Sequence, residues 1–287
     1  MRDSVGGGVM KIRFGYAPGP LPDRATFLHV VDDLDRLGFD SIWLPEILGG
    51  LTFDPLSALG VVAGRVDRLK IGTQFVVPGR QPARLAKECA TLDRLSGGRL
   101  LMTFVPGLED AEEIALMGVT KADRAGLLEA GLAYCREHWL TDDLRPEQRP
   151  LEVWLGGMGP KALERAGRLS DGWIPGFISP EIAAAGRVQI LRHAEDADRE
   201  ISPEHFGANL VYSRGEPPAE LLARLAARQP GTDPRAFVPT TWTQLRSMID
   251  RYLTGGMSKF VLRPAAPPHD WSTELAEVAA EILPLQV

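Results

Sequence analysis

Short apolar runs alternate with longer segments of helical spacing along almost the whole chain. Residues 11–16 (KIRFGY) form the first predicted strand, and residues 27–37 carry apolar side chains on one helical face before Gly38, a residue typical of a helix end. The same alternation predicts further strands at residues 41–44, 69–77, 99–104, 152–155, 172–174, 208–212 and 259–262. Eight strands separated by helices predict an α/β fold of one domain, a closed (β/α)8 TIM barrel, rather than an open sheet.

Three segments interrupt this alternation. Residues 110–139 are read as a longer helical region, and residues 214–241, rich in Pro, Ala and Arg, as a mobile excursion over the barrel mouth. Residues 1–10 contain three consecutive glycines and are predicted to be a disordered N-terminal lead. The barrel domain is therefore expected to cover residues 11–287.

Composition narrows the possible partners and compartments. A formal charge of -6 gives no electrostatic reason to bind nucleic acid or an anionic membrane. No apolar run approaches the roughly 20 residues of a membrane span, and no secretion signal is evident, so a cytoplasmic protein is expected. Cys89 and Cys135 lie in helical patterns without CxxC spacing, and the five histidines show no paired spacing, so no metal site is expected.

A glycine-rich turn is the strongest candidate for chemistry, because barrel enzymes work where strands end and helices begin. Gly156, Gly157, Met158 and Gly159 follow the strand at 152–155 and precede an amphipathic helix. Bare backbone amides at a helix start bind phosphate groups. A tight turn that needs a positive φ would explain the same glycines without a ligand.

Four motifs together resemble the bacterial luciferase-like oxidoreductase superfamily, most closely its coenzyme F420-dependent branch. They are SIWLPE (41–46), IGTQFVVPGRQPARLAKECATLDRLSGGR (71–99), VWLGGMGPKALERAGRLSDGWIP (153–175) and GGMSKFVLRP (255–264). The resemblance implies a TIM barrel that holds F420, or FMN as the alternative. It also implies hydride transfer between that ring and a small organic substrate, and a homodimer.

Carried over residue by residue, the resemblance assigns Gly156, Gly157, Met158 and Gly159 to the cofactor phosphate and places Pro175 near the cofactor tail. The bond between Gln74 and Phe75 matches a position at which F420 enzymes have a non-proline cis peptide that presses on the ring. An ordinary trans strand end is the alternative, because a non-proline cis bond costs roughly 3 to 4 kcal/mol.

The proposed catalytic residue is Glu46, after the second strand. The family often has a histidine next, where this chain has Ile47. A carboxylate in a partly dry mouth can act as a general acid or base. The alternative is that Glu46 pairs with an arginine and only shapes the site.

After the fourth strand the chain departs from the glycine-rich run against which the family's cofactor rests. Val105 and Gly107 stand there, with Phe104 and Pro106 as bulky or rigid neighbours. Glu109 falls near an acid that F420 members use, but it also suits the start of a helix.

The residues leave three functions open. An F420-dependent oxidoreductase comes first and an FMN-dependent luciferase-like monooxygenase second. A barrel that binds cofactor but has lost turnover is the third, because of the altered strand-four loop and the missing histidine. A phosphate-ligand isomerase or lyase would need a strong acid and base pair at the mouth.

Overall fold

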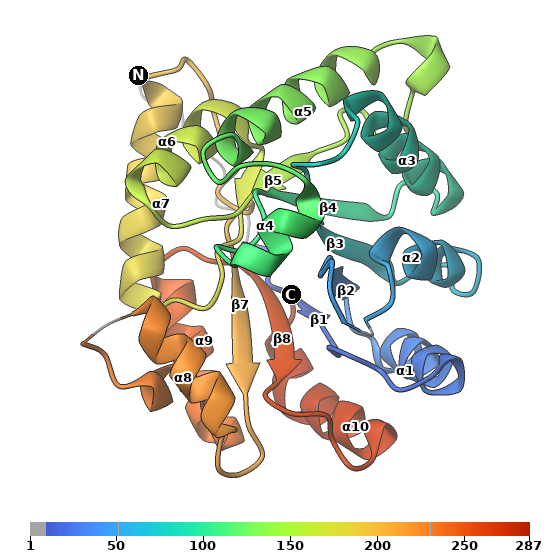
Figure 1. Ribbon diagram of the computed structural model, residues 1–287. Helices are drawn as coiled ribbons and strands as arrows, with labels where there is room; N and C mark the ends of the chain where they lie inside the picture. The colour runs from blue at the N-terminus through green and yellow to red at the C-terminus, as the bar shows by residue number, and fades with distance from the viewer. Residues whose placement is uncertain (1–9, 51, 230) are drawn as a thin grey trace, which may run out of the picture.

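Eight parallel strands form the centre of the molecule in the computed structural model, and helices surround them (Figure 1). The structure describes residues 10–50, 52–229 and 231–287, so almost all of the predicted N-terminal lead lies outside the described residues. The strands are β1 (Arg13–Tyr16), β2 (Ser41–Pro45), β3 (Lys70–Val76), β4 (Leu100–Val105), β5 (Val153–Leu155), β6 (Gly172–Trp173), β7 (Gly207–Tyr212) and β8 (Lys259–Pro264). The predicted single-domain TIM barrel is confirmed.

The helices follow the strands in the order that the alternation predicts. They are α1 (Arg24–Leu37), α2 (Pro55–Ala63), α3 (Pro82–Leu95), α4 (Ala111–Met117), α5 (Arg124–His138), α6 (Pro160–Leu169), α7 (Pro180–Glu195), α8 (Ala219–Arg228), α9 (Trp242–Thr254) and α10 (Trp271–Ile282), with short 3-10 turns η1 (Asp142–Leu144), η2 (Pro234–Phe237) and η3 (Leu283–Leu285).

The strands pair in the order β6-β5-β4-β3-β2-β1-β8-β7, every pair parallel. The ring closes between its two outer strands through a single bridge from Trp173 to Phe206. In TIM-barrel enzymes the active site is built from the loops that follow the carboxyl ends of the strands. The pairing therefore gathers the loops after β1 to β8 at one end.

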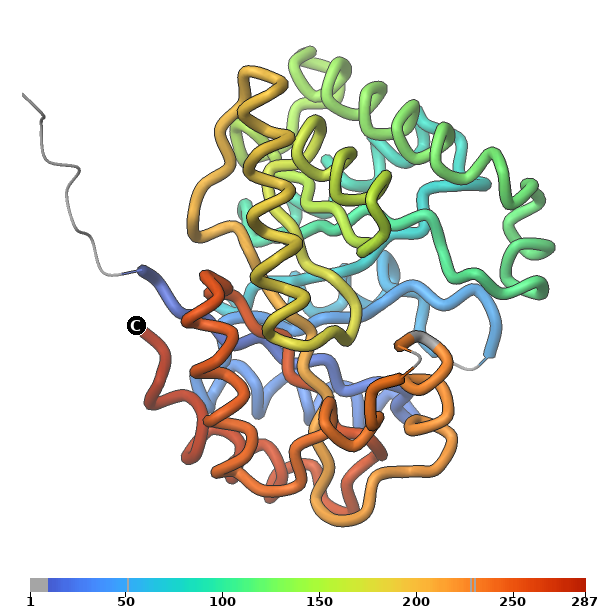
Figure 2. Tube along the Cα trace, turned by 90° about the vertical axis from the view of Figure 1, so that its left-hand side faces the viewer, coloured from blue at the N-terminus to red at the C-terminus, as the bar shows by residue number. Residues whose placement is uncertain are grey.

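Local sequence sets the helix ends. Asp23 caps α1 by accepting from the Thr26 amide, and Gly38 ends it in the left-handed region with φ 93, as predicted. Asp54 caps α2, whose first residue is Pro55. On the outside, α6 and α7 lie side by side (Figure 2). They can approach this closely because Gly167 has no Cβ; an added one would stand 2.5 Å from the Cβ of His193. The C-terminus lies beside the start of β1 in the same view.

Two segments differ in detail from the sequence-based expectation. The region 110–139 is two helices, because Gly118 ends α4 with φ 67 before α5 begins. The expected mobile excursion at 214–241 contains α8 and η2. Leu222, Leu225 and Phe237 pack there in a small core against Val211 of β7, so the apolar spacing of residues 221–225 outweighs the Pro, Ala and Arg composition.

The middle of the barrel is filled by side chains. Ala17, Trp43, Ile174 and Val261 form a buried cluster of their own, with Trp154 packed against it. This cluster contains residues from strands on opposite sides of the ring, as expected for inward-facing positions. It separates the carboxyl ends of the strands from the amino ends.

Candidate functional site

The predicted glycine turn lies between β5 and α6 and is held in one conformation. Gly157 has φ 98, and a Cβ added there would stand 2.8 Å from the Cβ of Ala162. The indole Nε1 of Trp173 donates a hydrogen bond to the carbonyl oxygen of Gly157 at 2.9 Å. Position 157 therefore requires glycine. The hydrogen bond from Trp173 attaches the turn to β6.

The same turn presents backbone donors to solvent. Among the described residues, no acceptor is hydrogen-bonded to the amides of Gly157, Met158 or Gly159. Gly159 is the N-cap of α6 without a side-chain cap, and Pro160 has no N–H. Exposed amides at the positive end of a helix dipole fit an anion. The turn therefore has the donors that a phosphate group of F420 or FMN would need, and its role as the cofactor site stays a prediction.

The two residues predicted to contact the cofactor after β4, Val105 and Gly107, lie in different surroundings. Val105 covers Gly156, whose added Cβ would stand 3.2 Å from the Val105 side chain. Gly107 instead lies under α4, where the sulfur of Met117 would stand 3.1 Å from an added Cβ. Arg124 of α5 donates to the carbonyl oxygens after β4, including that of Leu108 at 2.7 Å. The loop is therefore fixed by α4 and α5.

Of the two alternatives at the end of β3, the structure has the trans bond. Within the described ranges, the cis peptide is Arg149–Pro150, and the bond between Gln74 and Phe75 is trans. The reason is the unbroken ladder with β4, in which Gln74 pairs with Thr103 and the next pair follows in register. No extra residue is left to bulge toward a cofactor.

Phe75 also faces away from the barrel interior. Its ring is fully buried against Phe104 in an edge-on contact, with centroids 6.2 Å apart, under the guanidinium of Arg80. Gln74 is two residues after Gly72, which touches the inward-facing Trp43, so Gln74 faces the interior. Phe104 therefore lies outside the barrel interior and does not fill the mouth.

Glu46 is brought into an ion pair. Its side chain is 6% exposed, pairs with Arg80 and accepts from the amide of Val76 at 2.7 Å. Arg80 also reaches Glu88 at 3.1 Å. Burial acts against the charge of Arg80, but the two carboxylates hold its pKa above the ordinary value. This is the arginine pair that the alternative interpretation of Glu46 describes.

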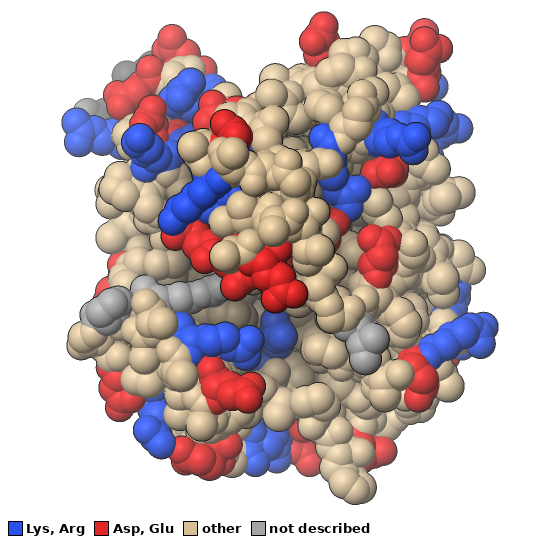
Figure 3. All heavy atoms as spheres, in the orientation of Figure 1, with Lys and Arg blue, Asp and Glu red and all other residues tan. Residues whose placement is uncertain are grey.

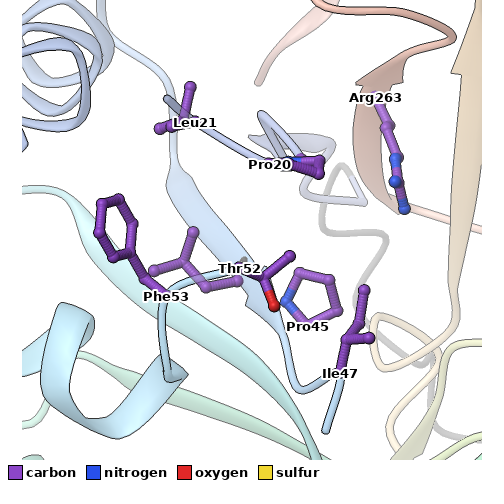
Figure 4. A pocket seen from close by; sticks show the side chains of 9 residues that line it. Pro20, Leu21, Pro45, Ile47, Thr52, Phe53 and Arg263 are labelled. Carbon is purple, nitrogen blue, oxygen red and sulfur yellow. The ribbon is translucent and has the colours of Figure 1, made fainter. Parts of the chain in front are cut away.

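Arg263 lies in the closing motif at residues 255–264, but the sequence analysis gave it no role. It is the penultimate residue of β8 and lines a small pocket with Pro45, Ile47 and Phe53. Figure 4 shows its guanidinium reaching into this pocket from the side opposite Phe53. Within the part of the chain that the structure describes, no carboxylate pairs with it. Burial, and to a lesser degree Arg224, lowers its pKa.

The remaining predicted residues lie at the rim. Pro175 is buried after β6, and its carbonyl oxygen accepts from Asn209 at 2.7 Å. Glu109 is 72% exposed and pairs with Lys121 at 3.1 Å, while Asp110 caps α4. The space-filling view shows a hollow between acidic side chains over α4 and basic side chains on its other side (Figure 3). Glu46 and Glu109 thus sit in separate ion pairs and form no acid and base pair.

Within residues 10–50, 52–229 and 231–287, no group of three His, Cys, Asp or Glu side chains is arranged to hold a metal ion. In the same residues, no helix has the length and apolar character needed to cross a bilayer.

Comparison with known proteins agrees with this geometry. The family model described as luciferase-like monooxygenase matches residues 7–258. A phthiodiolone/phenolphthiodiolone dimycocerosates ketoreductase of Mycobacterium sp. (strain JLS) is 27% identical over 206 residues, which are 61% of this chain and 54% of that protein. The chain thus spans about half the length of that relative.

Two further relatives match over nearly the whole chain. An F420-dependent glucose-6-phosphate dehydrogenase of Microbacterium testaceum (strain StLB037) is 26% identical over an alignment of 338 residues, covering 95% of this chain and 97% of that protein. A solved F420-dependent secondary alcohol dehydrogenase has a TM-score of 0.81 at 17% identity, covering 97% of this chain and 100% of that one, and so shares the fold. The chain belongs to the luciferase-like monooxygenase family of oxidoreductase enzymes.

Proposed function

We propose that the protein is an F420-dependent oxidoreductase that transfers a hydride between F420 and a small organic substrate. The observation that carries the proposal is the turn at residues 156–159, where three amides without hydrogen-bond partners in the described chain stand at the start of α6. The named relatives that depend on F420 support the choice of cofactor. When bound, the cofactor supplies the hydride chemistry.

The chain's own residues would bind and position the cofactor. The amides of Gly157, Met158 and Gly159 would hold the phosphate, and Trp173 would keep the turn in place through its bond to Gly157. Glu46 would act as a positioning residue, because both of its oxygens are occupied, one by Arg80 and one by Val76. Proton transfer by Glu46 would require it to leave Arg80.

Titration of the purified protein with F420 and, separately, with FMN tests the proposal. We expect saturable binding of F420 at micromolar concentrations with weaker binding of FMN, followed by reduction of F420 when a panel of small alcohols is added. The FMN alternative predicts the reverse order of affinity. Tight binding without turnover on any alcohol would support a barrel that has lost catalysis, and no binding of either cofactor would refute the proposal.

A matched pair of glycine variants isolates the turn. Gly157→Ala places a Cβ 2.8 Å from Ala162 at φ 98, whereas Gly159→Ala meets nothing within 4 Å. We expect Gly157→Ala to weaken F420 binding at least tenfold, because a strained φ costs about 1 to 3 kcal/mol. Gly159→Ala keeps its amide and should stay within about threefold of the parent protein.

A further inference from the structure

A cavity of about 200 Å³ lies inside the barrel at the amino ends of the strands, away from the glycine turn. Its wall includes Gly15, Trp43, Trp154, Val261 and the charged residue Lys259. The buried cluster in the middle of the barrel forms its far end. Catalytic sites of TIM barrels lie at the other end, so the proposed oxidoreductase activity does not account for this space.

The aromatic walls of the cavity are held against glycines. A Cβ on Gly15 or Gly72 would stand 2.8 or 2.5 Å from the indole of Trp43. A Cβ on Gly172 would stand 2.5 Å from the indole of Trp154. Each indole therefore lies directly on bare backbone, and larger residues at these positions would push it inward. The glycines keep the indoles at the wall and the space between them open.

Charged side chains line the cavity unevenly. The Oδ1 atom of Asp40 forms ion pairs with Nζ of Lys70 at 3.0 Å and with Nε of Arg13 at 3.6 Å. Lys259 differs, because in the described residues its nearest carboxylate is Glu204 at 3.9 Å, beyond hydrogen-bonding distance. Its ammonium donates instead to the carbonyl oxygen of Lys11 at 2.6 Å. One cationic donor at the cavity thus lacks a closely bound anion.

Basic residues gather on one side of the ring. Arg13, Lys70 and Lys259 stand at the starts of β1, β3 and β8. Across the barrel, Glu152 is held near His205 at 3.6 Å. An anionic group near β8 would therefore meet cations, with Glu152 on the far side of the cavity, while an apolar body would contact the indoles.

We propose that this cavity binds a small aromatic carboxylate, with its ring against Trp43 and Trp154 and its carboxylate at Lys259. The size fits one ring, since apolar cavities of about 150 Å³ hold benzene, and sites for drug-sized ligands start at about 300 Å³. The ring gains contact area with the indoles. The carboxylate gains a charge-assisted hydrogen bond.

The protonation of Lys259 sets the pH range of binding. Burial lowers the pKa of Lys259 to about 8; Glu204 and Asp40 raise it, and Arg13 and Lys70 lower it. A carboxylate ligand needs the charged ammonium. Its affinity should therefore fall as the pH rises above about 8 and should depend little on pH in a variant without this lysine.

Titration with benzoate and with toluene, its neutral counterpart, tests the proposal through the fluorescence of the buried tryptophans. We expect saturable benzoate binding at pH 7 that Lys259→Met weakens at least tenfold, with toluene binding unchanged. The matched control is Arg263→Met at the opposite end of β8, which should leave benzoate affinity within twofold. Lys259→Gln serves the same purpose should the methionine variant fail to fold.

Three results would overturn the proposal. One is the absence of saturable benzoate binding up to about 10 mM, which is weaker than any useful site. Another is benzoate binding that both Lys259 variants leave unchanged. The third is loss of benzoate binding in Arg263→Met, which would place the ligand at the catalytic mouth. None of these results bears on F420 binding, which is measured separately.

Discussion

The two ends of the barrel are equipped in opposite ways, and β8 shows the contrast within six residues. Arg263 is the penultimate residue of the strand and lines a pocket of about 20 Å³ at the carboxyl end of the barrel, the end that carries the glycine turn. Lys259 begins it at a cavity of about 200 Å³. The larger space thus lies at the end where barrel enzymes do not perform chemistry. Backbone amides without partners, more than cavity size, distinguish the carboxyl end.

The largest effect is expected from disturbing the packed middle that separates the two ends. Gly72→Val would drive a side chain into the indole of Trp43, because even an added Cβ would stand 2.5 Å from that ring. We expect the free energy of unfolding to fall by about 3 kcal/mol, the upper range for overpacked cores, as measured by urea denaturation. Trp43→Leu in the same chain should restore part of the loss, and a fully stable single variant would refute the packing argument.

Removing the buried carboxylate at the catalytic end should have the next largest effect. Glu46→Gln leaves Arg80 with Glu88 alone, and we expect the free energy of unfolding to drop by about 2 kcal/mol. Glu88→Gln is the control, because that partner is 37% exposed and such pairs contribute about 1 kcal/mol or less. If Glu46 only positions the site, the activity of Glu46→Gln keeps the pH profile of the parent. A lost limb of that profile would assign proton transfer to Glu46.

The charge at the mouth should affect binding more than stability. Arg263 has no carboxylate partner among the described residues, so Arg263→Met should not lower the melting temperature. We expect it to weaken binding of anionic F420 about tenfold, the effect of one charge-assisted hydrogen bond. Arg224→Met, on the exposed side of α8, should change the affinity less than about threefold. Unchanged affinity in Arg263→Met would remove this residue from the site.

The smallest effect is a pH dependence at the amino end. Folding lowers the pKa of Lys259 from 10.5 to about 8. Between these values the unfolded chain binds more protons, so the free energy of unfolding should rise with pH across this window. Full burial would give about 3 kcal/mol between pH 7 and pH 10. Solvent screening of this partly exposed ammonium reduces the difference expected against Lys259→Met in denaturation experiments to about 1 kcal/mol. Parallel curves for the two proteins would contradict the buried position of this lysine.

Most of the fold could be predicted because each unit carries its own local signal. Strand periodicity, the cap at Asp54 and the left-handed stop at Gly38 are properties of a few consecutive residues. The break at Gly118 was missed because helical spacing continues on both sides of it. In residues 214–241, composition suggested a mobile loop although α8 has a clear apolar face.

The candidate site could be predicted from the sequence only where a backbone conformation that favours glycine defines it. The glycine turn is visible in the sequence because glycine alone suits φ 98 at position 157. The partners of Glu46 and the isolation of Arg263 depend on contacts between distant strands and loops, which no local pattern records. The expected cis bond at Phe75 came from resemblance and does not fit the regular ladder between β3 and β4.

The most direct test of the central claim is to record the backbone amide resonances of Gly157, Met158 and Gly159 while F420 is added. We expect these three amides to show some of the largest shifts in the protein, because they would donate to the cofactor phosphate. F420 binding that shifts other amides and leaves residues 157–159 unchanged would contradict it.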